Sequence, residues 1–193
     1  RFQSLTLRNR SEQVDVYSAN LDFYKELRPQ HTLYYGVEFI TNQVQSTAFS
    51  ENIETGELAP VSTRYPDGSS WTTYAAYLSY RFRATDQLFA EAALRYSQVD
   101  LQATFDKAFF PFPFDDADLN TGALNGSLGF TYTPDEVTQF NLNLSTGFRA
   151  PNIDDVGKLF DSEPGNVIVP NANLQPEYAY SAEIGVERIF AKR

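Results

Sequence analysis

The sequence predicts an all-β protein, an antiparallel up-and-down meander of seven or eight strands that is a partial segment of a large transmembrane β-barrel. Three observations predict this fold. Apolar and polar residues alternate with a period of two along most of the 193 residues. Several alternating runs are longer than the usual strand of about five or six residues. The connections between these runs alternate between short and long.

Composition narrows the class of protein. The chain has no cysteine, which excludes disulfides and thiolate metal sites. Residues 1–4 lack the apolar stretch of a signal peptide, and no run approaches the roughly 18 apolar residues of a transmembrane helix. These observations do not exclude transmembrane strands, because the hydropathy signal of such strands is weak. A net charge of -10 argues against nucleic acid as a partner.

The strands and connections follow from the alternation. Strands are predicted at 13–26, 32–50, 71–83, 87–104, 120–133, 137–148 and 177–190, with a candidate eighth at 2–8. Short turns are predicted at 27–31, 84–86 and 134–136, and long loops at about 51–70, 105–119 and 149–176. Strict alternation places all short turns at one end of the meander. Bacterial outer-membrane barrels have this arrangement, with short periplasmic turns and long extracellular loops.

Each predicted strand has an apolar face and a polar face. In the strand 137–148, Phe140 and Leu144 lie on one side and Asn141 and Asn143 on the other. Alternation alone fits a half-solvated sheet on a soluble core as well as a barrel with apolar residues toward lipid and polar residues toward the lumen. Strand length and loop alternation favour the barrel. Its lumen-facing candidates are Glu91, Arg95, Asn141, Asn143, Glu183 and Glu187.

Aromatic residues, 12 Tyr, 16 Phe and 1 Trp, gather toward both ends of the strands. Membrane barrels carry such girdles at their two water interfaces. The group near the short turns is Phe23, Tyr24, Tyr34, Tyr35, Tyr80, Phe82, Phe89, Tyr132, Phe140 and Phe190, and the group near the long loops is Tyr17, Trp71, Tyr74, Tyr96, Phe148 and Tyr178.

Seven or eight strands leave two sheet edges without a partner. An unpaired edge cannot face lipid, because its backbone groups would lack hydrogen-bond partners. We therefore expect residues 1–193 to be one fragment of a larger barrel whose closing strands are absent from this sequence.

The long loops are acidic, with four Asp or Glu against one Lys or Arg in each when Arg149 is left aside. Such a face does not steer an anionic ligand inward, but it suits divalent cations, a cationic partner or plain solvation. Residues 116–122 resemble the start of a calcium loop, with the glycine one position late and Ser127 in place of the bidentate Glu. His31 is the only histidine, so no Ser-His-Asp set exists, and we expect no enzyme, cofactor or metal site.

Two short boxes flank the last long loop. In the first, Phe148-Arg149-Ala150-Pro151-Asn152, proline removes a backbone donor and ends the strand. Arg149 falls on the polar face, where it is expected to pin the loop to the barrel wall by pairing with Glu177, or to contact a ligand. The candidate rim or ligand-loop residues are Phe148, Arg149, Pro151, Asn152, Asn171, Asn173 and Glu177.

These boxes carry a resemblance to a family. The runs 147–152, 170–177 and 183–187, with the upstream runs 16–22 and 35–38, resemble the barrel of TonB-dependent outer-membrane receptors. The resemblance implies a barrel of about 22 strands filled by an N-terminal plug, which takes up a scarce nutrient with energy from the inner-membrane TonB complex. Neither the plug nor the TonB-contacting segment is expected in this sequence, and the lumen-facing residues would contact the plug.

The paired boxes are also similar to those of haem and haemoglobin receptors, where they flank a haem-ligating histidine. Here the second box is Asn171-Ala172-Asn173-Leu174, and no histidine lies between the boxes. The resemblance therefore implies a bacterial outer-membrane segment, in contact with lipid, for TonB-driven uptake of an iron complex, either siderophore or haem. Two alternatives are a soluble all-β adhesion or carbohydrate-binding module and an outer-membrane enzyme barrel.

Overall fold

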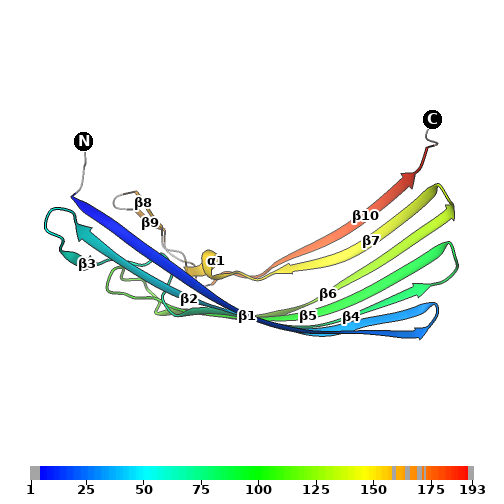
Figure 1. The fold of residues 1–193 in the computed structure, drawn as a ribbon, viewed down its shortest axis with the longest axis horizontal. Helices are drawn as coiled ribbons and strands as arrows, with labels where there is room; N and C mark the ends of the chain where they lie inside the picture. The colour runs from blue at the N-terminus through cyan, green and yellow to red at the C-terminus, as the bar shows by residue number, and fades with distance from the viewer. Residues whose placement is uncertain (1–4, 158–159, 164–165, 169–170, 172, 191–193) are drawn as a thin grey trace.

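The computed structural model describes residues 5–157, 160–163, 166–168, 171 and 173–190, which form one curved antiparallel sheet with long connections at one end (Figure 1). The long strands are β1 (Thr6–Arg28), β2 (His31–Asn52), β4 (Ser69–Arg83), β5 (Leu88–Thr104), β6 (Asp116–Asp135), β7 (Thr138–Arg149) and β10 (Glu177–Arg188). They lie side by side in chain order, so the predicted meander is confirmed.

The two ends of the sheet differ, as the loop lengths predicted. Short turns join β1 to β2, β4 to β5 and β6 to β7 at the right-hand end of Figure 1. The long connections gather at the other end, the loop end. They contain β3 (Leu58–Pro60), which pairs with the end of β2, the short helix α1 (Ile153–Gly157), and the hairpin of β8 (Phe160–Glu163) and β9 (Asn166–Ile168). None of these short elements was predicted.

The strands extend further into the loop end than alternation indicated. The predicted separate strand at 2–8 is wrong, because its described part is the beginning of β1, a strand of 23 residues that pairs with β2 from Thr6 onward. The polar run Asn9–Glu12, which lay outside the predicted strands, continues the ladder. A tilted strand needs only about 9–11 residues to cross the hydrocarbon, so a strand of 23 residues is longer than a crossing requires and its extension needs no apolar face.

The register brings the apolar side chains onto one face. Leu21, Val37, Ala76, Tyr96 and Leu124 form one continuous row across five strands. Many large apolar side chains on this face are exposed, including Leu94 and Leu124. A face of this extent is unstable in water and matches the lipid-facing band of a membrane barrel.

Aromatic pairs lie on this apolar face on both sides of the row of Leu21 and Val37. Phe39 packs against Tyr74 near the loop end, with ring centroids 5.4 Å apart, and Phe23 stacks on Tyr35 near the short turns at 5.1 Å. Four predicted girdle members belong to the opposite face by register, which corrects their assignment: Tyr24, Tyr34, Trp71 and Phe89. Their position along the strand was right, but the parity of their residue numbers turns them inward.

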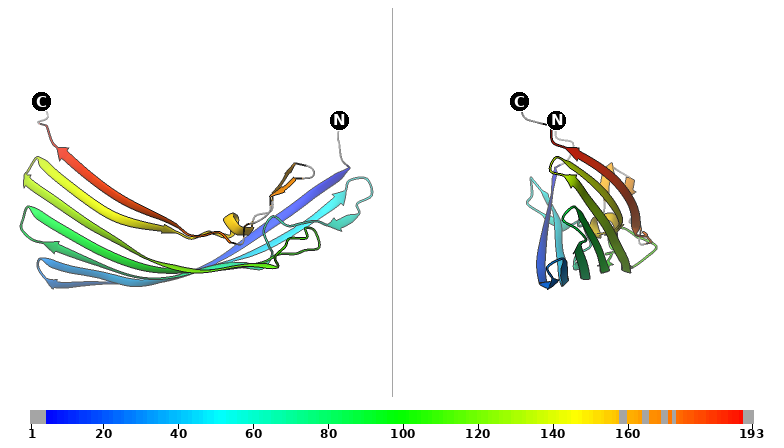
Figure 2. Two further views of the ribbon diagram at one scale, coloured as in Figure 1. Left: turned by 180° about the vertical axis from the view of Figure 1, so that it is seen from behind. Right: turned by 90° about the vertical axis from the view of Figure 1, so that its right-hand side faces the viewer.

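The opposite face is concave and polar, and α1 and the long connections lie within its curve (Figure 2). The Tyr77 hydroxyl crosses β2 to donate a short hydrogen bond to Asp22. Gly36 allows this crossing, because a Cβ there would lie 2.7 Å from Tyr77 Oη. The concave face thus holds polar side chains that contact each other across intervening strands.

The sheet has two edge strands, β1 and β10, each paired on one side within the described residues. In that same part of the chain, no helix is long and apolar enough to cross a membrane.

Candidate functional site

Arg149 lies at the junction of β7, β10 and α1. Its Nη2 donates to both carboxylate oxygens of Asp155, at 3.0 and 2.7 Å, and its Nη1 lies 3.4 Å from Glu177 Oε1. Glu177 faces Arg149 directly in the register of β7 and β10. The expected contact with Glu177 is therefore present, and Asp155 is an additional partner that the sequence did not indicate.

Asn152 and Asp155 fix the first turn of α1. The Asn152 backbone N–H donates to Asp155 Oδ2, and the Asp155 N–H donates to Asn152 Oδ1, both at 3.0 Å. This reciprocal pair is a capping box, in which each side chain satisfies a backbone N–H left free at the helix start. Asp155 thus connects the cap of α1 to the guanidinium of Arg149.

The helix closes an apolar cluster over the concave face, which we call the loop-end core. Its buried members are Val44, Leu101, Ala103, Phe105, Phe112, Ala117, Ile153 and Val156. Ile153 and Val156 come from α1, and Leu174 of the second box packs against the same cluster. The second box and the helix that directly follows the first box therefore meet at one core.

A second polar contact joins this helix to another long loop. The Tyr65 hydroxyl donates to Asp154 Oδ1 at 2.6 Å. Burial raises the pKa of Tyr65 above its ordinary value, and the hydrogen bond to the Asp154 carboxylate raises the pKa further. The connection before β4 and the connection after β7 are thus held together at the mouth of the curved sheet.

The second box is described only in part, because Pro170 and Ala172 lie outside the described residues. Asn171 Oδ1 accepts a hydrogen bond from the Asn173 N–H at 3.0 Å, which forms a local turn. Both asparagines are exposed. Phe148 of the first box packs on Tyr178, with ring centroids 5.5 Å apart, and Pro151 is buried. The boxes therefore shape the rim of the sheet.

The predicted lumen-facing residues lie on the concave, polar face by register. Arg95 pairs with Glu38 at 2.6 Å, two strands away, and Glu91 accepts hydrogen bonds from Arg81 and Ser79. Asn141 accepts from Thr131 and Gln139, and Asn143 faces Glu183 across β7 and β10. Glu183 and Glu187 are exposed on β10. These residues form neighbouring pairs along the face and do not converge on one point.

Two further predictions concern sites outside the rim. The calcium-loop-like run 116–122 lies within β6, so it forms no loop that could wrap around an ion. His31 begins β2 at the short-turn end, where its ring stacks on Phe82 and hydrogen-bonds Tyr80. No described group of three or more His, Asp or Glu side chains is placed to hold a metal ion.

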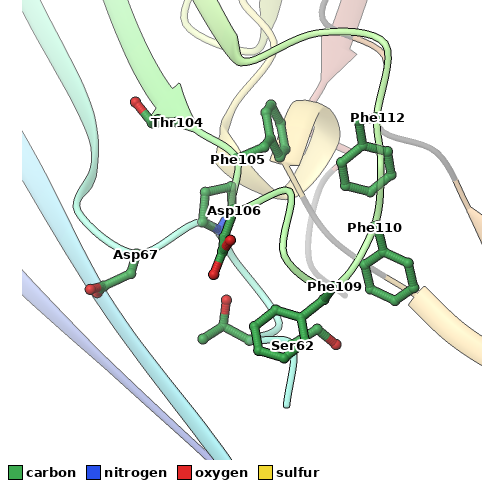
Figure 3. Close-up of a pocket in the computed structure, with 10 residues that line it drawn as sticks. Ser62, Asp67, Thr104, Phe105, Asp106, Phe109, Phe110 and Phe112 are labelled. Carbon is green, nitrogen blue, oxygen red and sulfur yellow. The ribbon is translucent and has the colours of Figure 1, made fainter. Parts of the chain in front are cut away.

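A cavity of about 240 Å³ lies between the connections that precede β4 and follow β5 (Figure 3). Phe105, Phe109, Phe110 and Phe112 contribute its aromatic side. The signal for it was in the sequence, as the dense run Phe109-Phe110-Pro111-Phe112-Pro113-Phe114, but alternation has no means of locating a pocket in an irregular loop. The remaining lining residues are Ser62, Thr63, Pro66, Asp67, Thr104 and Asp106.

Solved structures share the fold of this chain. The copper transporter OprC superposes with a TM-score of 0.76 and 13% identity, over 95% of this chain and 29% of that chain. The hemophore receptor HasR of Serratia marcescens, solved with its hemophore HasA and heme, superposes with a TM-score of 0.70 and 17% identity, over 92% of this chain and 30% of that chain. The FrpB iron transporter from Neisseria meningitidis superposes with a TM-score of 0.62 and 16% identity, over 93% of this chain and 26% of that chain. This chain thus spans less than a third of each.

Family membership rests on a separate comparison. A search of curated proteins found no significant match. The model of the TonB dependent receptor-like β-barrel family, in contrast, matches residues 2–193. Barrels of this family lie in the outer membrane of Gram-negative bacteria, which agrees with the apolar convex face and its aromatic pairs. The chain belongs to the TonB dependent receptor-like β-barrel family.

Proposed function

We propose that this chain is the barrel segment of an outer-membrane receptor that takes up an iron complex, a siderophore or haem, with energy from the TonB complex. The observation that carries the proposal is the match of the family model to residues 2–193. One compared structure is named an iron transporter, and another is a hemophore receptor in complex with its hemophore and heme. The loops around the mouth then capture the ligand, and the barrel performs no covalent chemistry.

The remaining strands and an N-terminal plug complete the receptor in this proposal. The free edges of β1 and β10 require further strands, because unpaired backbone groups cannot face lipid. The polar concave face, with Glu91, Arg95 and Glu183, is suited to a polar plug that fills the lumen. Contact with TonB belongs to the plug side of the receptor.

OprC is named a copper transporter, and this chain covers 29% of it. Copper favours imidazole and sulfur ligands. The chain has no Cys, no Met and a single His. That histidine lies at the short-turn end, away from the loops. This segment by itself would therefore offer few ligands to a bare copper ion, and in the proposal it contacts a metal that a chelator surrounds.

Uptake by cells tests the proposal. A strain that lacks the receptor containing this chain is compared with its parent for growth and radioactive iron uptake on defined ferric siderophores and on haem. We expect uptake of one complex to disappear with the receptor and to disappear equally when TonB is removed. Unchanged uptake of every iron complex, together with TonB-dependent uptake of copper or another nutrient, would overturn it.

A further inference from the structure

The aromatic cavity at the loop end has the chemistry of a cation-binding subsite. Its volume of about 240 Å³ is below the roughly 300–1,000 Å³ of pockets that enclose a drug-sized ligand. It therefore accommodates one ring-sized group of a larger ligand. In Figure 3 the Asp106 carboxylate points among the lining residues, with Asp67 to one side and the rings of Phe109, Phe110 and Phe112 on the other.

Both carboxylates retain acceptor capacity. Asp67 Oδ1 accepts the Ser46 N–H and Asp106 Oδ1 accepts the Ala108 N–H, each at 2.8 Å. The Oδ2 atom of each has no hydrogen-bond partner among the residues that the structure describes. An ionised carboxylate accepts several hydrogen bonds, so a charged donor in the cavity would find an acceptor in Asp106. The Asp67 carboxylate points away from the rings in Figure 3, and it adds a second negative charge at the edge of the cavity.

Basic side chains do not neutralise these two acids. No Lys or Arg lines the cavity. Lys107, next to Asp106 in sequence, forms an ion pair with Asp115 instead. Arg10 approaches from outside the lining and donates to Ser62 O at 3.2 Å and to Ser62 Oγ at 3.4 Å. Arg64, in the same connection as Asp67, lies over the Tyr65 ring at 5.5 Å, and neither Asp67 nor Asp106 forms an ion pair within the part of the chain that the structure describes.

The aromatic wall adds to the preference for a positive charge. The faces of phenyl rings attract cations, and they also cover an apolar body. Phe105 and Phe112 are buried in the loop-end core and pack edge to face, with centroids 5.8 Å apart, so the back of the cavity is fixed. Phe109 is 37% exposed and does not belong to that core, so it can contact an incoming group.

We propose that this cavity binds a protonated amine or quaternary ammonium group carried on an apolar or aromatic body, as one part of the transported ligand. The inference rests on the uptake function proposed above and narrows its ligand to complexes that bear an organic cation. The acidic loops support it, because their field attracts cations and repels anionic complexes.

Binding of three matched probes to the complete receptor in detergent tests the inference: benzylammonium, neutral benzyl alcohol and anionic benzoate. Saturation-transfer NMR or calorimetry gives the affinities. We expect benzylammonium to bind at least about tenfold more tightly than benzyl alcohol, and benzoate to show no binding, because a like charge beside two carboxylates is unfavourable. Equal binding of benzoate and benzylammonium would overturn the subsite.

Variants locate the binding. The double change Asp67→Asn and Asp106→Asn removes both charges and should weaken benzylammonium at least about tenfold. The matched control, Glu54→Gln with Glu57→Gln, removes two charges from the same connection as Asp67, outside the cavity, and should leave affinity within about twofold. Phe109→Leu retains an apolar side chain without a ring and should weaken benzylammonium but not benzyl alcohol. An unchanged affinity in both cavity variants contradicts the inference.

Radioactive iron uptake measured in parallel separates the two proposals. Normal TonB-dependent iron uptake without any preference for benzylammonium overturns the cation subsite and leaves the uptake function standing. A clear preference for benzylammonium in a receptor that takes up no iron complex overturns the uptake function instead.

Discussion

Arg149 joins two acidic side chains that belong to different elements, Asp155 of α1 and Glu177 of β10. The arginine is more than half exposed, and exposed ion pairs contribute little to the stability of a whole protein. We therefore expect Arg149→Ala to loosen the connection 150–176 while the barrel still folds. Limited proteolysis of the receptor in intact cells measures the loosening.

The control for this variant is Arg83→Ala at the short-turn end, which should leave loop cleavage unchanged. Arg149→Lys should give a cleavage rate between those of wild type and Arg149→Ala. Lysine keeps the positive charge, but it lacks the guanidinium fork that contacts Asp155 and Glu177 through separate nitrogens. Selective loss of ligand uptake in Arg149→Ala, with an unaltered cleavage pattern, would assign the arginine to the ligand and not to the loop.

Tyr65 supplies a pH-dependent contact at the same end of the sheet. Burial and the Asp154 carboxylate both disfavour the phenolate, so the pKa of Tyr65 is raised. A raised folded-state pKa means that the contribution to stability is complete below the ordinary tyrosine value near 10 and is lost as pH rises through the folded-state value.

Difference spectrophotometric titration of wild type against Tyr65→Phe should therefore show one phenol that ionises at a higher pH than exposed tyrosines do. Asp154→Asn should lower the pKa of that phenol, because it removes the negative charge of the partner. An ionisation that coincides with the exposed tyrosines in wild type would contradict the contact.

At the scale of the element, α1 is too short to be stable alone, and its tertiary contacts hold it. Ile153 is buried in the loop-end core, so Ile153→Ala should cost about 2 kcal/mol of local stability. Asn152→Ala removes the cap and should cost about 1 kcal/mol. Hydrogen exchange of the Val156 N–H, which bonds Asn152 O, reports both losses.

Gln175→Ala is a suitable control in the same connection. The Gln175 side chain lies outside the core, and its hydrogen bond to Asn173 O is long, at 3.4 Å. Its Val156 exchange should match wild type. Equal protection of Val156 in Ile153→Ala and wild type would show that the core does not hold the helix.

At the scale of the whole molecule, the two faces of the sheet meet different solvents. Leu128 lies midway between the row of Leu124 and the row of Tyr132 on the apolar convex face, whereas Ser127 lies on the polar face. Leu128→Arg in the complete receptor should destabilise the barrel by about 2–4 kcal/mol, because it places a charge near the bilayer midplane.

Ser127→Arg is the matched control, one residue away, and should cost far less because its side chain enters a polar lumen. Denaturant unfolding in lipid vesicles gives both values. A cost for Ser127→Arg equal to that for Leu128→Arg would contradict the assignment of the faces.

The sequence by itself determined the meander, the two ends and the faces of most strands, because alternation and loop length are local properties that a membrane barrel preserves strand by strand. It also indicated the pair of Arg149 and Glu177, since both stand on the polar face at facing strand ends. Several predicted strands ended too early at the loop end, and the strand predicted at 2–8 is in fact the beginning of β1. Polar strand extensions lack the apolar alternation on which the prediction depends.

Only the tertiary structure decided what the long connections do. Asp155 became a partner of Arg149 through the cap of α1, Trp71 turned inward to pack against the loop-end core, and four phenylalanines enclosed a cavity with two acids. Irregular loops have no periodicity to read, and their contacts join residues that are far apart in the chain. The pairing of the strands is therefore predictable from local alternation, whereas the structure at the mouth of the sheet depends on packing among three separate connections.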